Sequence, residues 1–359
     1  MRIVVVALAL LMGSLPAMGQ ESGKLDLRAL IQACRGDYQR LCAGVQPGNG
    51  AILTCLRQHE DQVSAGCKAA AAQQRSEMPA QSGGGNLARP GSLVPANEKL
   101  PSGTQLQRDI SYGSDPKQKI DVYRPANAAA SPAPLPILVM VHGGAWAFGD
   151  KASPGVVSAK ASYWLGRNYI FVSVNNRLLP TADPAQQAAD VAAAIAKVQA
   201  EASTWHGDPA RIVLMGHSAG AHLVSLLSTD PSIAAKVGAR PWLGTVSLDS
   251  AALNVPAIME KRHARLYDTA FGKDASYWRQ VSPIDRLQQK PMPMLLVCST
   301  RRLDSCGPAQ EFAGKVTSLG GQASVLPEDL SHEEINATLG EPGAYTDKVE
   351  AFMQSIGLP

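Results

Sequence analysis

Residues 105 to 359 alternate between short apolar runs and longer stretches with helical spacing, and this alternation limits the possible folds more than any other feature. The apolar runs lie at 119–123, 136–141, 169–174, 211–215, 245–248, 293–298 and 323–326. The helical patterns lie at 155–166, 184–202, 219–228, 308–319 and 343–356. Apolar strands that alternate with helices predict a doubly wound, mostly parallel α/β sheet covered on both faces. In such a sheet, the site is expected at the carboxyl ends of the strands.

The first nineteen residues have the pattern of a secretory signal peptide. Arg2 supplies one positive charge, and the apolar run 3–12 is too short to span a bilayer. Ala17 and Gly19 are small residues at the −3 and −1 positions of a cut before Gln20. A retained N-terminal anchor is the alternative. We therefore expect residues 1–19 to be removed from an exported protein, periplasmic or secreted, without a stable membrane span.

Four of the six cysteines lie in the segment 25–72, where helical patterns at 25–41 and 52–71 are joined by a turn at 44–50. They are Cys34, Cys42, Cys55 and Cys67. Cysteines of exported proteins usually pair. Helices joined by a short turn run antiparallel, so a hairpin favours nested pairs, Cys42–Cys55 inside Cys34–Cys67, although four cysteines allow three connectivities. A zinc site is the alternative, but the segment has no C-x-x-C pair and only one histidine, His59.

Composition marks a domain boundary and excludes some partners. Residues 76–103 are rich in glycine, serine and proline, which predicts a flexible linker before a catalytic domain at 105–359. The formal net charge of +3 is too small to argue for nucleic acid or an anionic membrane. The helical hairpin is a candidate site for a protein partner.

The segment Gly216-His217-Ser218-Ala219-Gly220 follows the apolar run 211–215 and opens a helical pattern. A G-x-S-x-G sequence between a strand and a helix is typical of a nucleophilic serine on a sharp, strained turn. The helix that begins there directs its N–H groups at a developing oxyanion. Ser218 is therefore the candidate nucleophile and Ala219 a candidate oxyanion-hole donor. The alternative is a structural serine in a tight turn.

A glycine pair follows the run 136–141, in the sequence His142-Gly143-Gly144-Ala145-Trp146. The oxyanion hole of an acyl-transfer enzyme needs two or more N–H donors, and glycines expose theirs because no side chain covers them. Gly143 and Gly144 are the candidates, with an ordinary glycine turn as the alternative. Trp146 is expected to shape the substrate pocket together with the segment 250–285.

A nucleophilic serine needs a base and an orienting acid, and in this arrangement the chain order is serine, acid, histidine. His332 follows the last predicted strand and is the candidate base. Asp304 is the carboxylate in the loop after 293–298, so it is the candidate acid. Asp249, at the end of the preceding strand, is the competing acid, or else holds a loop beside the pocket. Cys298 and Cys306 flank Asp304, and a disulfide between them would pin its loop.

These motifs resemble the esterase and lipase branch of the α/β-hydrolases that carries an HGG oxyanion motif, including hormone-sensitive-lipase-like, kynurenine-formamidase-like and feruloyl-esterase-like enzymes. The matching segments are HGGAW (142–146), NNRLLP (175–180), GDPARIVLMGHSAGAHL (207–223) and DLSHEEIN (329–336). The loop 299–304 departs from the pattern, because it lacks the usual glycine and early aspartate. The cysteine-rich segment resembles a repeat found in Golgi-apparatus sialoglycoproteins and in some bacterial exported proteins.

The resemblance implies a Ser–Asp–His triad that acts on a short-chain or aryl ester without a cofactor. The sequence contains no recognisable metal-ligand cluster and no phosphate-binding glycine loop. An amidase or formamidase with the same triad is the second hypothesis. A non-catalytic binding protein, with the helical hairpin as its docking element, is the third.

Overall fold

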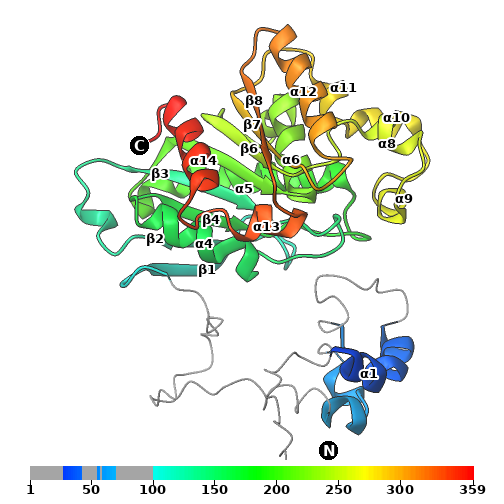
Figure 1. Cartoon of the computed structure of the whole chain (residues 1–359). Coiled ribbons are helices and arrows are strands. Elements are labelled where there is room, and N and C mark those ends of the chain that lie inside the picture. Colours follow the sequence, from blue (N-terminus) through cyan, green and yellow to red (C-terminus); the bar gives the residue numbers. More distant parts are fainter. Residues whose placement is uncertain (1–26, 43–54, 57–58, 70–99) are drawn as a thin grey trace, which may run out of the picture. The chain divides into compact units, whose positions relative to one another are not determined.

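The computed structural model describes residues 27–42, 55–56, 59–69 and 100–359, shown as ribbons in Figure 1. The chain divides into two compact units, within residues 1–91 and 92–359. The expected signal peptide, 1–19, and most of the expected linker, 76–99, lie outside the described residues.

The first unit is small and is built around two disulfides. Its elements are α1 (Leu27–Leu41), the 3₁₀ turn η1 (Glu60–Gln62) and a helical turn at 65–69. Cys34 is bonded to Cys67 and Cys42 to Cys55, which are the nested pairs. The predicted helix over 52–71 is not continuous, because Val63 has extended backbone with φ −71° and ψ 136°. The buried Asp37 joins the two halves by accepting hydrogen bonds from the N–H and Oγ of Ser64.

The second unit contains an eight-stranded sheet in the order β1-β2-β4-β3-β5-β6-β7-β8. Its strands β2 to β8 correspond to the predicted apolar runs, and all neighbours from β4 to β8 pair in parallel. β1 and β2 pair antiparallel, as do β2 and β4. β1 was not expected, because an edge strand whose residues are exposed or half-buried has no apolar run. The strands are β1 (Gln105–Ser111), β2 (Lys119–Arg124), β3 (Leu135–Val141), β4 (Ile170–Val174), β5 (Gly207–His217), β6 (Gly244–Leu248), β7 (Met294–Ser299) and β8 (Ala323–Glu328).

Helices cover both faces of this sheet because alternate strand residues point to opposite sides. Val139 of β3 packs in the cluster that contains α5 and α6, whereas its neighbour Met140 packs in the cluster that contains α4 and α14. In β7, Leu296 packs with α12, and Leu295 lies in the cluster of α14. The long helices are α4 (Pro154–Leu165), α5 (Pro184–Glu201), α6 (Ala219–Thr229), α12 (Cys306–Ser318) and α14 (Ala344–Ser355).

Shorter helices complete the second unit, and four of them form an insertion between β6 and β7. The insertion is built from α8 (Val255–Met259), α9 (Arg265–Phe271), α10 (Ala275–Gln280) and α11 (Pro283–Arg286). The others are α7 (Pro231–Ala235), α13 (His332–Ala337), and the 3₁₀ turns η2 (Ala128–Ala130) and η3 (Ala202–Trp205). Within the described residues, every helix is too short or too polar to cross a bilayer.

Candidate active site

Ser218 lies on a strained turn between β5 and α6. Its backbone has φ 56° and ψ −116°, a conformation that residues other than glycine rarely adopt. Its N–H donates to the carbonyl of Leu248 at the end of β6, over 2.9 Å. A side chain at Gly220 would place its Cβ 2.3 Å from the carbonyl oxygen of Val141, so only glycine lets α6 start this close to β3. The turn presents Ser218 to a pocket of about 260 Å³.

The glycine loop after β3 packs directly against this serine. A Cβ on Gly143 would lie 2.9 Å from Cβ of Ser218, and the carbonyl of Gly144 accepts from the N–H of Phe148 over 2.8 Å. Ala145, with φ 51°, lines the pocket beside Ser218 and Ala219. As the first residue of α6, Ala219 has an N–H without an intrahelical acceptor. The structure thus places Gly143, Ala145 and Ala219 beside Ser218, whereas Gly144 packs against Phe148; the unusual backbone of Ala145 is not revealed by the sequence.

His332 is the first residue of α13, and a capping box fixes this start. The side chain of Ser331 accepts from the N–H of Glu334, whose carboxylate accepts from the N–H of Ser331 over 2.7 Å. Nε2 of His217 lies 2.9 Å from the carbonyl oxygen of His332. The side chain of His332 is 27% exposed and lines the same pocket as Ser218.

The carboxylate that contacts His332 is Asp249. Its Oδ2 lies 2.5 Å from Nδ1 of His332, and its side chain is fully buried. Asp249 follows β6, with φ 54°, and its N–H donates to the carbonyl of Val297 in the neighbouring β7. This short bond places the Nδ1 proton of neutral His332 on the side of Asp249, which leaves Nε2 free to accept a proton.

Asp304 lies elsewhere, contrary to the expectation that it would contact His332. Its side chain is 60% exposed and pairs with Nη2 of Arg302 over 3.1 Å. The loop after β7 places Arg302, and not Asp304, beside His332: Nη1 of Arg302 lies 2.8 Å from Nδ1 of His332. In the sequence, the departure of the loop 299–304 from the family pattern indicated that this loop differs from its counterparts. It did not indicate which carboxylate contacts His332 in place of Asp304.

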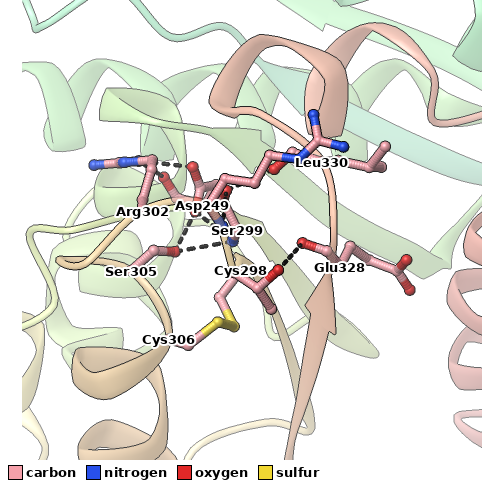
Figure 2. The surroundings of a disulfide bond; sticks show 10 residues. Asp249, Cys298, Ser299, Arg302, Ser305, Cys306, Glu328 and Leu330 are labelled. Atoms are coloured by element: carbon pink, nitrogen blue, oxygen red, sulfur yellow. Dashed lines mark hydrogen bonds and ion pairs between the residues drawn. A yellow bond between two sulfur atoms is a disulfide. The ribbon is translucent and has the colours of Figure 1, made fainter.

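Besides His332, three residues of the loop between Cys298 and Cys306 donate hydrogen bonds to the carboxylate of Asp249 (Figure 2). The N–H of Ser299 donates to Oδ1 over 2.9 Å, and the hydroxyl of Ser305 donates to the same oxygen. Nη1 of Arg302 donates to Oδ2 over 2.6 Å. Burial alone would raise the pKa of Asp249. The hydrogen bonds from His332 and Ser305, the charge of Arg302 and the N–H of Ser299 outweigh burial and hold that pKa well below its usual range.

The disulfide Cys298–Cys306 closes this loop, whose ends are eight residues apart. Cys298 belongs to β7 and Cys306 begins α12. The bond therefore fixes both ends of the segment that carries Ser299, Arg302 and Ser305 to the sheet and to a long helix.

Two aromatic side chains, Trp146 and Tyr267, line the pocket. The ring of Trp146 lies 4.8 Å from that of Phe271 and 6.1 Å from that of Tyr267, both in α9 of the insertion. The indole N–H of Trp146 donates to Nδ1 of His222, whose Nε2 lies 2.7 Å from the carbonyl oxygen of Val281. Burial lowers the pKa of His222 to about 4, so this histidine stays neutral and braces Trp146. Trp146 lines the pocket beside Ser218, together with five residues of the segment 250–285: Ser250, Ala251, Ala252, Leu266 and Tyr267.

Sequence comparison places this unit among known esterases. The family model BD-FAE matches residues 120–304, more than half of the 359-residue chain. The chain belongs to the BD-FAE family of carboxylesterase-type α/β-hydrolases. The cysteine-rich repeat model matches residues 24–64 of the first unit. No group of three or more His, Cys, Asp and Glu side chains in the described part of the chain is arranged to hold a metal ion.

Curated relatives include esterases, and a solved esterase structure shares the fold. The chain is 34% identical over 120 residues to a probable isoprenylcysteine alpha-carbonyl methylesterase of Arabidopsis thaliana, covering 33% of this chain and 24% of the relative. It is 28% identical over 215 residues to Esterase LipC of Mycobacterium tuberculosis, covering 54% and 51%. The chain thus spans about a quarter to a half of these relatives. The structure of esterase B from Lactobacillus rhamnosis has the same fold, with a TM-score of 0.60 at 17% identity, covering 85% of this chain and 94% of that one.

Proposed function

We propose that this chain is a serine carboxylesterase in which Ser218 is the nucleophile, His332 the base and Asp249 the acid. One observation carries the proposal: the buried Asp249 lies 2.5 Å from Nδ1 of His332, behind a pocket that His332 shares with Ser218. A strained serine, a histidine and a buried carboxylate in this relation form the machinery of acyl transfer. The membership of the chain in an esterase family supports an ester as substrate.

The mechanism follows from the positions of the protons. Nε2 of His332 accepts the proton of the Ser218 hydroxyl while Oγ attacks the carbonyl carbon of the ester. The carbonyl oxygen becomes an oxyanion, which accepts hydrogen bonds from the N–H groups of Ala219 and of the loop 143–145. His332 then protonates the leaving alcohol as the bond between the acyl carbon and the alcohol oxygen breaks. A water molecule next gives a proton to His332 and attacks the acyl carbon; the bond to Oγ of Ser218 breaks, and His332 returns the proton to Oγ. Asp249 balances the positive charge that His332 carries between these steps.

The pocket favours a small ester with an apolar portion. Its volume of about 260 Å³ is slightly below the usual range of about 300 to 1,000 Å³ for small-molecule sites. Trp146, Tyr267, Leu266 and Ala252 give it a largely apolar lining. We infer that a short-chain acyl or aryl group packs against this wall while the ester carbonyl faces Ser218.

Hydrolysis of p-nitrophenyl acetate and butyrate tests the proposal. We expect the wild-type protein to turn over both esters and Ser218→Ala to lose about 10⁶-fold in kcat. Ser250→Ala is a matched control, since Ser250 also lines the pocket but has no role in acyl transfer. Turnover by Ser218→Ala at the wild-type rate would contradict the mechanism.

An N-formyl aromatic amide of similar size, assayed beside the esters, separates an esterase from a formamidase with the same triad. We expect kcat/KM to be at least tenfold higher for the esters; the reverse order would assign the site to amides.

A fluorophosphonate probe distinguishes both enzymes from a binding protein, because it reacts only with an activated serine. Folded protein that the probe does not label at Ser218 would be a binding protein.

We also propose that the chain is exported after removal of residues 1–19, and that residues 76–103 link the cysteine-rich unit to the catalytic unit. The three disulfides support export, because disulfides persist in oxidising compartments. N-terminal sequencing of the mature protein is expected to start at Gln20. A mature protein that begins at Met1 would instead indicate a retained anchor. The cysteine-rich unit remains the candidate site for a protein partner.

A further inference from the structure

Arg302 contacts both the acid and the base of the proposed triad. Its Nη1 lies 2.6 Å from Oδ2 of Asp249 and 2.8 Å from Nδ1 of His332, and its side chain lines the pocket. Since Nδ1 and Oδ2 are themselves 2.5 Å apart, the three atoms form a triangle in which Oδ2 accepts from both nitrogens. A permanent positive charge therefore lies next to the imidazole that must become positive during the reaction.

We propose that Arg302 is a positioning residue that locks Asp249 onto His332 and, through its positive charge, opposes the positive charge that the imidazole takes up during the reaction. This inference rests on the proposed function, because it concerns the same His332 and Asp249. It adds a fourth side chain that contacts both the acid and the base of the triad.

The locking role follows from the bonds of each carboxylate oxygen. Oδ1 of Asp249 is held by Ser299 and Ser305, and Oδ2 faces His332. The bond from Arg302 to Oδ2 is the contact that keeps this second oxygen from rotating away when His332 moves. Arg302 also reaches the carbonyl oxygen of Asp249 over 3.4 Å.

The loop that carries Arg302 is tied to the segment that carries His332. The hydroxyl of Ser299 donates to the carbonyl of Leu330 over 2.5 Å, two residues before His332. The disulfide Cys298–Cys306 closes the same loop. A displacement of the loop would therefore move Arg302 and His332 together, which preserves their contact.

The charge role follows from the groups that face His332. Asp249 is negative and favours the imidazolium, whereas Arg302 is positive and opposes it. His217 contributes no charge, because burial holds its pKa well below the usual value. Asp304 neutralises part of the charge of Arg302 from its exposed position.

Two other cations near α13, Arg301 and Lys160, are bound to partners other than the imidazole of His332. Arg301 pairs with Asp329 and Glu334 on the exposed side of the helix. Lys160, from α4, donates to the carbonyl of Asn336 at the other end of α13. Among the described residues, Arg302 is the cation that the structure places against Nδ1 of His332. Its removal should therefore strengthen proton binding by His332.

The pH dependence of kcat/KM in Arg302→Ala, followed with p-nitrophenyl butyrate, tests both roles. We expect the acid limb of the profile to move up by about one pH unit, because the neutral form of the base becomes less populated. We expect kcat at the plateau to fall about tenfold, with KM changed less than threefold, because Asp249 loses an anchor. Arg301→Ala is the matched control from the same loop. It should leave the acid limb of the pH profile in place and change kcat at the plateau by less than about twofold.

Rescue separates a positioning role from a merely structural one. Arg302→Lys keeps the charge, so its acid limb should stay near the wild-type position while kcat remains reduced. Millimolar methylguanidinium should restore the acid limb and part of kcat in Arg302→Ala, because the deleted side chain lines an open pocket. An unchanged pH profile in folded Arg302→Ala would overturn the inference. If Arg302→Ala does not fold, Arg302→Lys decides the locking role. A wild-type pH profile with a wild-type kcat in Arg302→Lys would overturn that role, whereas a reduced kcat would support it.

An NMR titration of His332 keeps this inference separate from the proposed esterase activity. With isotope-labelled histidine and His332→Ala for assignment, the ring protons report proton binding without any substrate. Titration of His332 about one pH unit higher in Arg302→Ala than in the wild type supports the inference even if no tested ester is hydrolysed. An identical titration refutes it even if Ser218 proves to be the nucleophile.

Discussion

Asp249 and His332 are joined by a 2.5 Å contact between Oδ2 and Nδ1, although 83 residues separate them in the sequence. Asp249 follows β6, whereas the carboxylate expected from chain order, Asp304, follows β7. The two strands are neighbours in the sheet, so both carboxylates start from the same edge. The position after β7 that faces His332 is filled by Arg302, and the acid from the neighbouring strand takes over the contact.

Substitution of the two aspartates distinguishes these positions. Asp249→Asn should lower kcat by about 10³- to 10⁴-fold, because an amide at this place favours the wrong tautomer of His332. Asp304→Asn is the matched control and should retain at least half of kcat, since its exposed side chain pairs with Arg302 and, within the described part of the chain, makes no hydrogen bond to His332. Ester hydrolysis measured at saturating substrate gives both values. A larger loss in Asp304→Asn than in Asp249→Asn would return the acid to the loop after β7.

Removal of the Cys298–Cys306 disulfide should cost both stability and activity. Replacing both cysteines by alanine opens a loop whose ends are eight residues apart, which should lower the free energy of unfolding by about 2 to 3 kcal/mol. Activity should fall as well, because Ser299, Arg302 and Ser305 lose their fixed placement around Asp249. Urea denaturation and ester hydrolysis report the two effects. The control is Cys42→Ala/Cys55→Ala in the other unit, which should leave kcat unchanged; equal kcat in both double variants would show that the loop does not need its disulfide.

The buried Lys160 should make stability depend on pH. Its ammonium group is enclosed, and burial lowers its pKa to about 7, compared with about 10.4 in the unfolded chain. Between these values, the unfolded state binds more protons, so the free energy of unfolding rises with pH. The gain from pH 7.5 to 9.5 should be roughly 2 kcal/mol larger in the wild type than in Lys160→Met. Urea denaturation at the two pH values measures it. Lys348→Met, at an exposed ion pair, should keep the wild-type slope, and the same slope in Lys160→Met would contradict the assignment.

A shortened chain tests whether the catalytic unit acts alone. Residues 92–359 form one compact unit that contains every side chain of the proposed triad and its pocket. A chain that begins at Ser92 should therefore keep kcat/KM for p-nitrophenyl butyrate within about twofold of the full-length protein. A large loss with an unchanged circular dichroism spectrum would show that the cysteine-rich unit takes part in binding or catalysis.

Many of the strands and the cysteine pairs could be predicted from local patterns in the sequence. The apolar runs predicted seven of the eight strands, because buried parallel strands must be continuously apolar. β1 escaped detection because its side chains are exposed or half-buried. The predicted second hairpin helix was wrong in its continuity, since the extended Val63 interrupts it. The cysteine pairs could be predicted, because a hairpin brings its ends together.

The sequence by itself also identified Ser218, the glycine loop and His332 as the candidates, since each is read from residues that stand next to one another along the chain. Only the tertiary structure decided which carboxylate faces His332 and that Arg302 contacts both of these side chains. The reason is physical: parallel strands bring their carboxyl ends to one edge, so several loops compete for the same place. The path of the loop between Cys298 and Cys306, fixed by its disulfide and by its bonds to Asp249, decides which side chain reaches the imidazole.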